Sequence, residues 1–62
     1  MPVVTVEWWE GRTVEQKKQV VEGITSVLTG VGIPAEATTV IIKDNPKDNW
    51  GMGGKLASEP NK

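Results

Sequence analysis

The residue best suited to chemistry lies at the start of the chain, where Pro2 follows Met1. Methionine aminopeptidases remove Met when the next residue is small, and the mature chain would then begin with a secondary amine. An α-amino group has a pKa of about 7.7–8.0, and burial or a nearby cation lowers that value. The neutral amine of Pro2 would be a general base near neutral pH. The alternative, a proline that merely begins a strand, is favoured by composition alone.

Three further side chains suit a binding site for a small organic acid. Arg12 carries a planar fork of donors that matches a carboxylate, although an exposed loop arginine is the plainer interpretation. Trp9 and Trp50 would wall an apolar pocket, and buried interface contacts explain them equally well. No two carboxylates lie at a spacing that indicates a hydrolase.

The composition excludes several function classes. The chain has no His and no Cys, which removes imidazole and thiolate ligands for a metal as well as disulfides. A net charge of -1 argues against a nucleic-acid partner. No apolar stretch is long enough to span a bilayer, and Glu7 and Glu10 interrupt any signal-like segment. We therefore expect no metal, no nucleic acid, no membrane and a cytoplasmic location.

The length of 62 residues predicts a single domain over 1–62. A chain this short buries only about 60% of the surface that its unfolded form exposes. Small domains compensate with disulfides, metal or partners, and the first two are missing here. The sequence therefore predicts a multimer.

The pattern of apolar residues predicts three elements and a hairpin. A β-branched and aromatic run at 2–9 alternates in polarity and indicates a strand. Thr13 and Gln16 form a capping-box pair ahead of an amphipathic helix over 14–30. A second strand is expected at 38–43, a turn at 44–49 and a glycine-rich hairpin at 50–54.

The order of these elements predicts an α+β fold built on a β-α-β unit. The two strands would pair in parallel through a right-handed crossover helix, with the short hairpin following them. One helix covers one face of a two-stranded sheet, so the other face and both edges would need another subunit.

Together these features resemble the tautomerase superfamily, specifically the short 4-oxalocrotonate tautomerase (2-hydroxymuconate tautomerase) branch. The resemblance covers essentially the whole chain. It rests on Met1-Pro2, on the run 10–13 with 15–17, on the strand 40–42 and on the run 50–57.

The resemblance implies dimers with a four-stranded sheet, and three such dimers in a homohexamer. Pro2 would be the catalytic base, and Arg12 would bind the distal carboxylate of a small-molecule substrate. Trp50 and Trp9 fall where the family has pocket-lining residues. Tautomerisation of a 2-hydroxydienoate needs one base, one anion clamp and a dry pocket, with no cofactor and no metal.

One position departs from the family pattern, and another separates the chain from the dehalogenase branch of the superfamily. Thr39 aligns with a second arginine that polarises the 2-oxo end of the substrate, and it brings a hydrogen bond without a charge. Lys43 lies on the same strand face but about 13 Å further along. Met52 falls where the dehalogenase branch has a water-orienting carboxylate, which argues against efficient hydration. Thr39 thus predicts slow turnover of dicarboxylates or a different substrate.

Three functions remain open. The first is an enol–keto tautomerase of a small 2-hydroxydienoate or 2-oxo acid that uses Pro2 as its base. The second is another Pro-dependent enzyme, in which the Pro2 amine attacks an aldehyde. The third is a non-enzymatic assembly module, in which the fold serves only to build a multimer.

Overall fold

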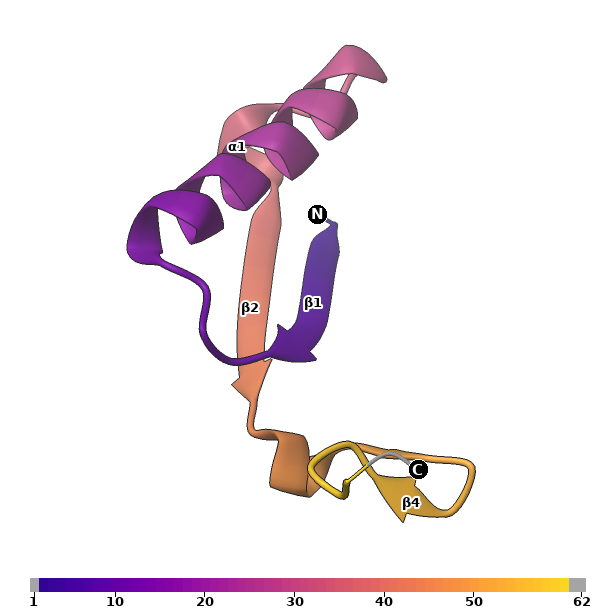
Figure 1. Cartoon of the computed structure of the whole chain (residues 1–62). Coiled ribbons are helices and arrows are strands. Elements are labelled where there is room, and N and C mark those ends of the chain that lie inside the picture. The colour runs from indigo at the N-terminus through magenta and orange to yellow at the C-terminus, as the bar shows by residue number, and fades with distance from the viewer. Residues whose placement is uncertain (1, 61–62) are drawn as a thin grey trace.

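A computed structural model of the chain describes residues 2–60. Strand β1 (Val3–Trp9) leads through a loop into helix α1 (Val14–Gly30), and the chain returns in strand β2 (Thr39–Asn45). The two strands pair in parallel, and α1 lies across one face of the pair (Figure 1). This arrangement confirms the predicted β-α-β unit.

The strand pairing extends beyond the predicted second strand, whose end was expected at Lys43. The register runs from Val3 opposite Thr39 to Trp9 opposite Asn45. Asp44 and Asn45 favour turns when read locally. Here the Asp44 carboxylate and the Asn45 side-chain amide both bond to Trp8, which holds these two residues in the ladder.

Helix α1 begins as the capping box predicts. The Thr13 hydroxyl accepts a hydrogen bond from the backbone N–H of Gln16, and the Gln16 side chain accepts one from the backbone N–H of Thr13. This reciprocal pair satisfies two of the N–H groups that a helix start leaves without partners. The helix ends at Gly30, as expected.

The chain after β2 forms an arm that leaves the sheet (Figure 1). A short 3-10 turn at Lys47–Asn49 leads into the hairpin strands β3 (Gly51–Met52) and β4 (Lys55–Leu56). Gly53 and Gly54 form the tip with φ of 59° and 81°, a conformation that favours glycine. The predicted hairpin is confirmed. A second 3-10 turn, Ala35–Ala37, precedes β2 and was not predicted.

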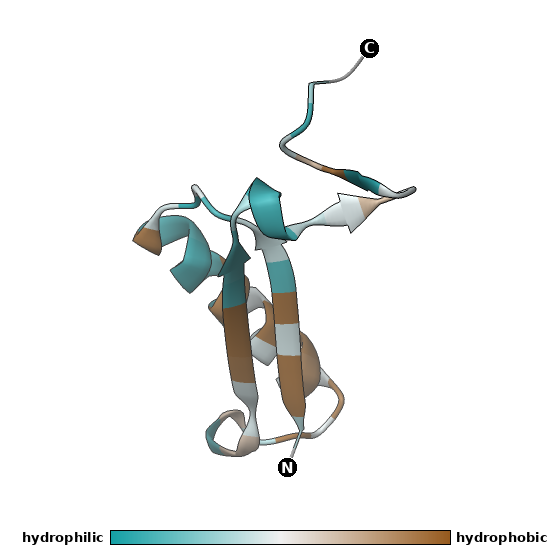
Figure 2. Ribbon diagram, turned by 90° about the horizontal axis from the view of Figure 1, so that it is seen from below, coloured by the Kyte–Doolittle hydropathy of each residue, from teal (hydrophilic) through white to brown (hydrophobic). Residues whose placement is uncertain are grey.

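The two faces of the sheet have different surroundings. Val4, Val6 and Trp8 are half-buried on the side of α1, whereas the side chains between them are exposed on the other side. Apolar residues nevertheless run along both strands (Figure 2). On the open face, Val3 is 57% exposed and Ile41 is 41% exposed.

The single chain exposes more surface and is more extended than a compact monomer of its size. Among residues 2–60, no hydrophobic side chain is fully buried. The radius of gyration is 15.0 Å, against about 11 Å for a compact chain of this length. The accessible surface of 4805 Å² likewise exceeds the ~3,900 Å² of a compact monomer of this mass. Within the described residues, no helix is both long and apolar enough to cross a membrane.

Candidate active site

Pro2 and Thr39 lie together at the amino end of the sheet. The backbone N–H of Thr39 donates a hydrogen bond of 3.1 Å to the carbonyl oxygen of Pro2. Pro2 is half-buried and Thr39 is exposed. The carbonyl of Pro2 is therefore bonded to β2, which holds this residue in a defined place. Met1, whose removal the sequence predicts, lies outside the described residues.

Arg12 lies at the opposite, carboxyl end of β1. Gly11 has φ of 119°, a value that L side chains rarely adopt, and it turns the chain from the strand toward the helix. Thr13 then starts α1 with its capping box. Arg12 is thus held between a sharp turn and a capped helix start, with its guanidinium carbon 5.2 Å from the centroid of the Trp8 ring.

Trp9 and Trp50 form an aromatic pair at the same end of the sheet. Their ring centroids are 5.8 Å apart with the planes at 76°, the edge-to-face arrangement that aromatic pairs favour. The Lys47 ammonium lies 4.7 Å from the centroid of the Trp9 ring. The arm is therefore anchored to β1 by Trp50 and Lys47, both on the same indole.

These side chains line a cavity of about 280 Å³ that is open to the surface. Its lining is three indoles, one guanidinium and one carboxylate, from Glu7, Trp8, Trp9, Arg12 and Trp50. Most ligand sites are concave and largely apolar, with a few placed polar groups. Three of the predicted site residues, Trp9, Arg12 and Trp50, therefore meet in one place.

Sequence reasoning missed a series of linked polar groups next to Arg12, formed by Trp8, Asp44 and Lys17. The indole N–H of Trp8 donates to Asp44 Oδ1 at 2.7 Å, and the Lys17 ammonium pairs with Asp44 Oδ2. The hydrogen bond from Lys17, followed by that from Trp8, lowers the pKa of the Asp44 carboxyl below its ordinary value. The alternation of β1 places Trp8 on the helix side, a position that looks like ordinary core.

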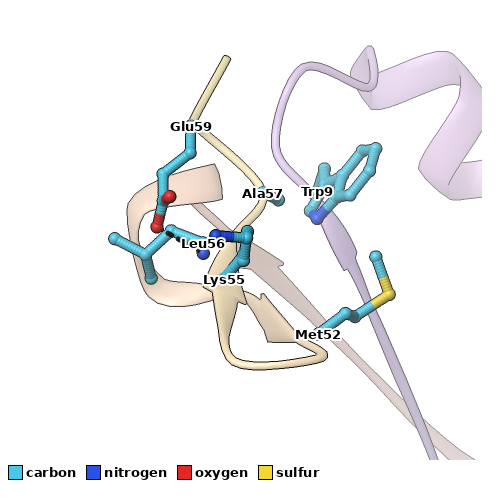
Figure 3. Close-up of a pocket in the computed structure, with 6 residues that line it drawn as sticks. All are labelled: Trp9, Met52, Lys55, Leu56, Ala57 and Glu59. Carbon is cyan, nitrogen blue, oxygen red and sulfur yellow. Dashed lines mark hydrogen bonds between the residues drawn. The ribbon is translucent and has the colours of Figure 1, made fainter. Parts of the chain in front are cut away.

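A second cavity of about 170 Å³ lies between the hairpin and the outer face of Trp9. The arm lines this cavity with Met52, Lys55, Leu56, Ala57 and Glu59. Met52 and Ala57 lie on the side of the indole, whereas the Leu56 side chain points away from it (Figure 3). Met52 is 63% exposed. Where a water-orienting carboxylate would be expected in the dehalogenase branch, this chain thus presents an exposed thioether beside the aromatic pair.

The predicted site residues fall into two groups that one chain does not bring together. Pro2 and Thr39 stand at one end of the sheet, and the cluster around Arg12 stands at the other. The seven residues of β1 separate them, and at about 3.3 Å per residue this separation is on the order of 20 Å. A small substrate cannot touch Pro2 and Arg12 of the same chain.

A parallel β-α-β unit that ends in a glycine hairpin, with an arginine and aromatic rings at one strand end, is typical of a small tautomerase. The sequence profile described as tautomerase enzyme matches residues 2–59. The chain belongs to the tautomerase family, in its 4-oxalocrotonate tautomerase branch, and is an enzyme of the isomerase class.

Known relatives support this assignment along the full chain. A 2-hydroxymuconate tautomerase of Comamonas testosteroni is 45% identical over 60 residues, which cover 95% of both proteins. A 4-oxalocrotonate tautomerase isozyme of Methylibium petroleiphilum is 46% identical, with a TM-score of 0.83 over 90% of this chain and 92% of that one. A further homologue, YwhB, is 38% identical and superposes with a TM-score of 0.90 over 97% and 100% of the two chains.

Proposed function

We propose that this tautomerase moves a proton within a small 2-hydroxydienoate or 2-oxo acid, with the Pro2 amine as general base after removal of Met1. The observation that carries the proposal is the placement of Pro2 in a chain of this family. The residue is half-buried at the head of β1, and its carbonyl is fixed by Thr39. Relatives named 2-hydroxymuconate tautomerase support the substrate class.

The proposed reaction uses Pro2 twice. The neutral secondary amine accepts the proton of the 2-hydroxyl group, and the electron pair of that O–H bond moves into the conjugated system. The ammonium then returns the proton to a carbon of the chain, which yields the keto form and restores the neutral amine. A secondary amine whose pKa lies near the working pH suits both halves of this cycle.

Arg12 has the role of an anion clamp in this proposal. Its guanidinium is exposed at the mouth of the indole-lined cavity. Within residues 2–60, the guanidinium makes no ion pair with a carboxylate. Its paired N–H donors can thus take both oxygens of a substrate carboxylate. The indoles exclude water around the conjugated chain, which strengthens that interaction.

The distance between Pro2 and Arg12 requires that each site combine two chains. We propose a homohexamer, a trimer of dimers, in which the amino end of one chain faces the carboxyl-end cavity of another. The open sheet face, the elongated arm and the apolar side chains that remain exposed within residues 2–60 all supply surface for such contacts. Homo-oligomers commonly close by point-group symmetry, which would make all the sites equivalent.

The Thr39 side chain affects which substrates we expect the enzyme to prefer. The backbone of Thr39 is bonded to Pro2, and its exposed side chain can donate one neutral hydrogen bond to the 2-oxo or carboxylate end. A charged donor at that place would be roughly twice as strong. We therefore propose that substrates with less negative charge at the reacting end are handled better than dicarboxylates.

Ultraviolet absorbance during ketonisation of 2-hydroxymuconate tests the proposal, with protein whose mass confirms loss of Met1. An N-terminal extension turns the Pro2 nitrogen into an amide and should lower kcat by about 10²–10⁴-fold, the usual contribution of a general base, while the assembly persists. Pro2→Ala keeps a primary α-amine in place of the proline ring and should lower kcat less. Undiminished activity in both would refute the role of Pro2.

Borohydride trapping separates the remaining catalytic alternative. If Pro2 attacks an aldehyde as an amine nucleophile, reduction should leave a covalent adduct whose mass is found on the first peptide. The proposed proton transfer leaves the protein mass unchanged. An adduct that forms with wild-type protein and is lost with the N-terminal extension would replace general-base catalysis by nucleophilic catalysis.

A further inference from the structure

The Arg12 guanidinium lies over an indole ring that is itself fixed in place. The guanidinium carbon is 5.2 Å from the centroid of the Trp8 ring, within the range of a cation–π contact. Arg12 is exposed, whereas Trp8 is half-buried on the helix side of the sheet. The more exposed side chain therefore lies over the more buried one.

Two other elements hold the indole. Trp8 stands opposite Asp44 in the parallel register, and its N–H donates to Asp44 Oδ1 at 2.7 Å. The second carboxylate oxygen pairs with Lys17 on α1. Strand β2 and helix α1 thus both fix the plane of the ring on which Arg12 lies.

This arrangement leaves the guanidinium free for a substrate. A ring face attracts the cation without supplying a carboxylate oxygen for its N–H donors. Within the described residues, the Asp44 carboxylate accepts from Trp8 and Lys17, and it forms no ion pair with Arg12. The ring therefore restricts the conformations of Arg12 and leaves its donors available.

We propose that Trp8, held by Asp44, is a positioning residue that presets Arg12 to bind the carboxylate farthest from the reacting atoms. This inference rests on the function proposed above. It assigns a role to an indole that the alternation of β1 would otherwise place among packing residues. A preset clamp loses less conformational freedom when the substrate arrives, which improves binding without a new contact.

The rival explanation is that Trp8 only fills space beneath α1. Trp8→Leu removes the ring face, and Trp8→Phe keeps a ring face but removes the N–H that Asp44 holds. Val6→Ala is the matched control, because Val6 is half-buried on the same face of β1 and loses packing alone.

The first measurement does not depend on activity. Arg12 is the only arginine in the chain, so ¹⁵N-labelled protein gives a single side-chain Nε–Hε resonance that needs no assignment. The ring current of Trp8 should move the proton of this resonance upfield. Trp8→Leu should return it to the position of a free arginine, and Val6→Ala should leave it shifted. An identical resonance in wild type and Trp8→Leu would overturn the inference.

The second measurement compares 2-hydroxymuconate with a 2-hydroxydienoate that has one carboxylate. Trp8→Leu should raise KM for the dicarboxylate about fivefold more than it raises KM for the monocarboxylate, and Trp8→Phe should show a smaller difference between the two substrates. A role in packing alone would change both substrates equally, as in Val6→Ala, and that result would also overturn the inference.

Failure of the proposed function would look different. In that case wild-type protein would turn over neither compound, while the arginine resonance would still report the contact. A shifted resonance that Trp8→Leu abolishes would then uphold the positioning of Arg12. An unshifted resonance would overturn it.

Discussion

Pro2 and Arg12 stand at opposite ends of β1, with the whole strand between them. The separation, on the order of 20 Å, exceeds the length of a small dienoate. If both residues serve one substrate, they must come from different chains. This relationship links catalysis to assembly, and it can be tested by mixing inactive variants.

The first prediction is that Pro2→Ala and Arg12→Ala restore each other's activity. Each variant alone should be much slower than wild type on 2-hydroxymuconate, because one lacks the anion clamp and the other has a primary amine in place of the proline ring. After joint unfolding and refolding, random exchange should give roughly a quarter of the sites both intact residues, since each site draws on two chains. Native mass spectrometry should verify that mixed multimers have formed. Mixed multimers without recovered turnover would place Pro2 and Arg12 of one site on the same chain.

The second prediction concerns the neutral residue Thr39, whose backbone is bonded to Pro2. Thr39→Arg should raise kcat/KM for 2-hydroxymuconate, by up to about 10²-fold, because a charged donor would stabilise the oxygen that gains negative charge. The backbone bond from Thr39 to Pro2 does not involve the side chain and should persist. Thr39→Val, of similar size without the hydroxyl, is the control and should lower the rate modestly. Equal rates in wild type and Thr39→Arg would mean that another cation already serves this place.

The third prediction concerns the start of α1. Thr13→Ala removes the hydroxyl that accepts from Gln16, and the free energy of unfolding should fall by about 1 kcal/mol. Thr13→Ser keeps the cap and should change little. Because Arg12 immediately precedes this residue, Thr13→Ala should also raise KM for the dicarboxylate. Denaturant unfolding and steady-state kinetics on the two variants check both effects, and equal stabilities would show that the capping box is dispensable.

Most of the fold could be predicted because its signals are local. The capping box fixed the first residue of α1, and the alternation of β1 separated its two faces correctly. The end of β2 was missed because Asp44 and Asn45 favour turns locally. Their bonds to Trp8 arise only once the strands are paired in register.

The candidate site was predicted only in part, for a similar reason. Residue type alone indicated Arg12 and Trp50, and their meeting in one cavity follows from the fold. The placement of Arg12 over Trp8 depends on the backbone of Gly11, whose φ of 119° redirects the chain toward the helix side. A strand pattern gives the face of each side chain but not the path of the loop after it.

The fourth prediction concerns acid stability. The bonds from Lys17 and Trp8 lower the pKa of Asp44 in the folded chain. A lowered folded-state pKa stabilises the protein above the unfolded value, about 3.9 for Asp, and this stabilisation is lost as the pH falls through the folded-state pKa. Asp44→Asn should therefore unfold at a lower temperature than wild type from pH 5 upward, and the difference should vanish in stronger acid.

Thermal melts at a fixed protein concentration between pH 2 and pH 7 measure this difference. Asp48→Asn is the control, because Asp48 lies in the exposed turn after β2. It should melt like wild type above pH 5. A constant gap between Asp44→Asn and wild type down to the lowest pH would show that the carboxylate charge does not stabilise the folded chain.

The fifth prediction is that the open sheet face holds the assembly together. Ile41 is 41% exposed on this face, opposite Thr5 in the register. Ile41→Asp would place a charge where the proposed hexamer buries apolar surface, and an unpaired buried charge is strongly unfavourable. The variant should dissociate at concentrations where wild type stays assembled, as measured by sedimentation. Its turnover should fall with dissociation, because the two ends of the site would no longer meet.

Ile41→Val keeps a β-branched apolar side chain and should remain assembled and active. A monomeric Ile41→Asp variant with full activity would show that one chain suffices and would contradict the shared site.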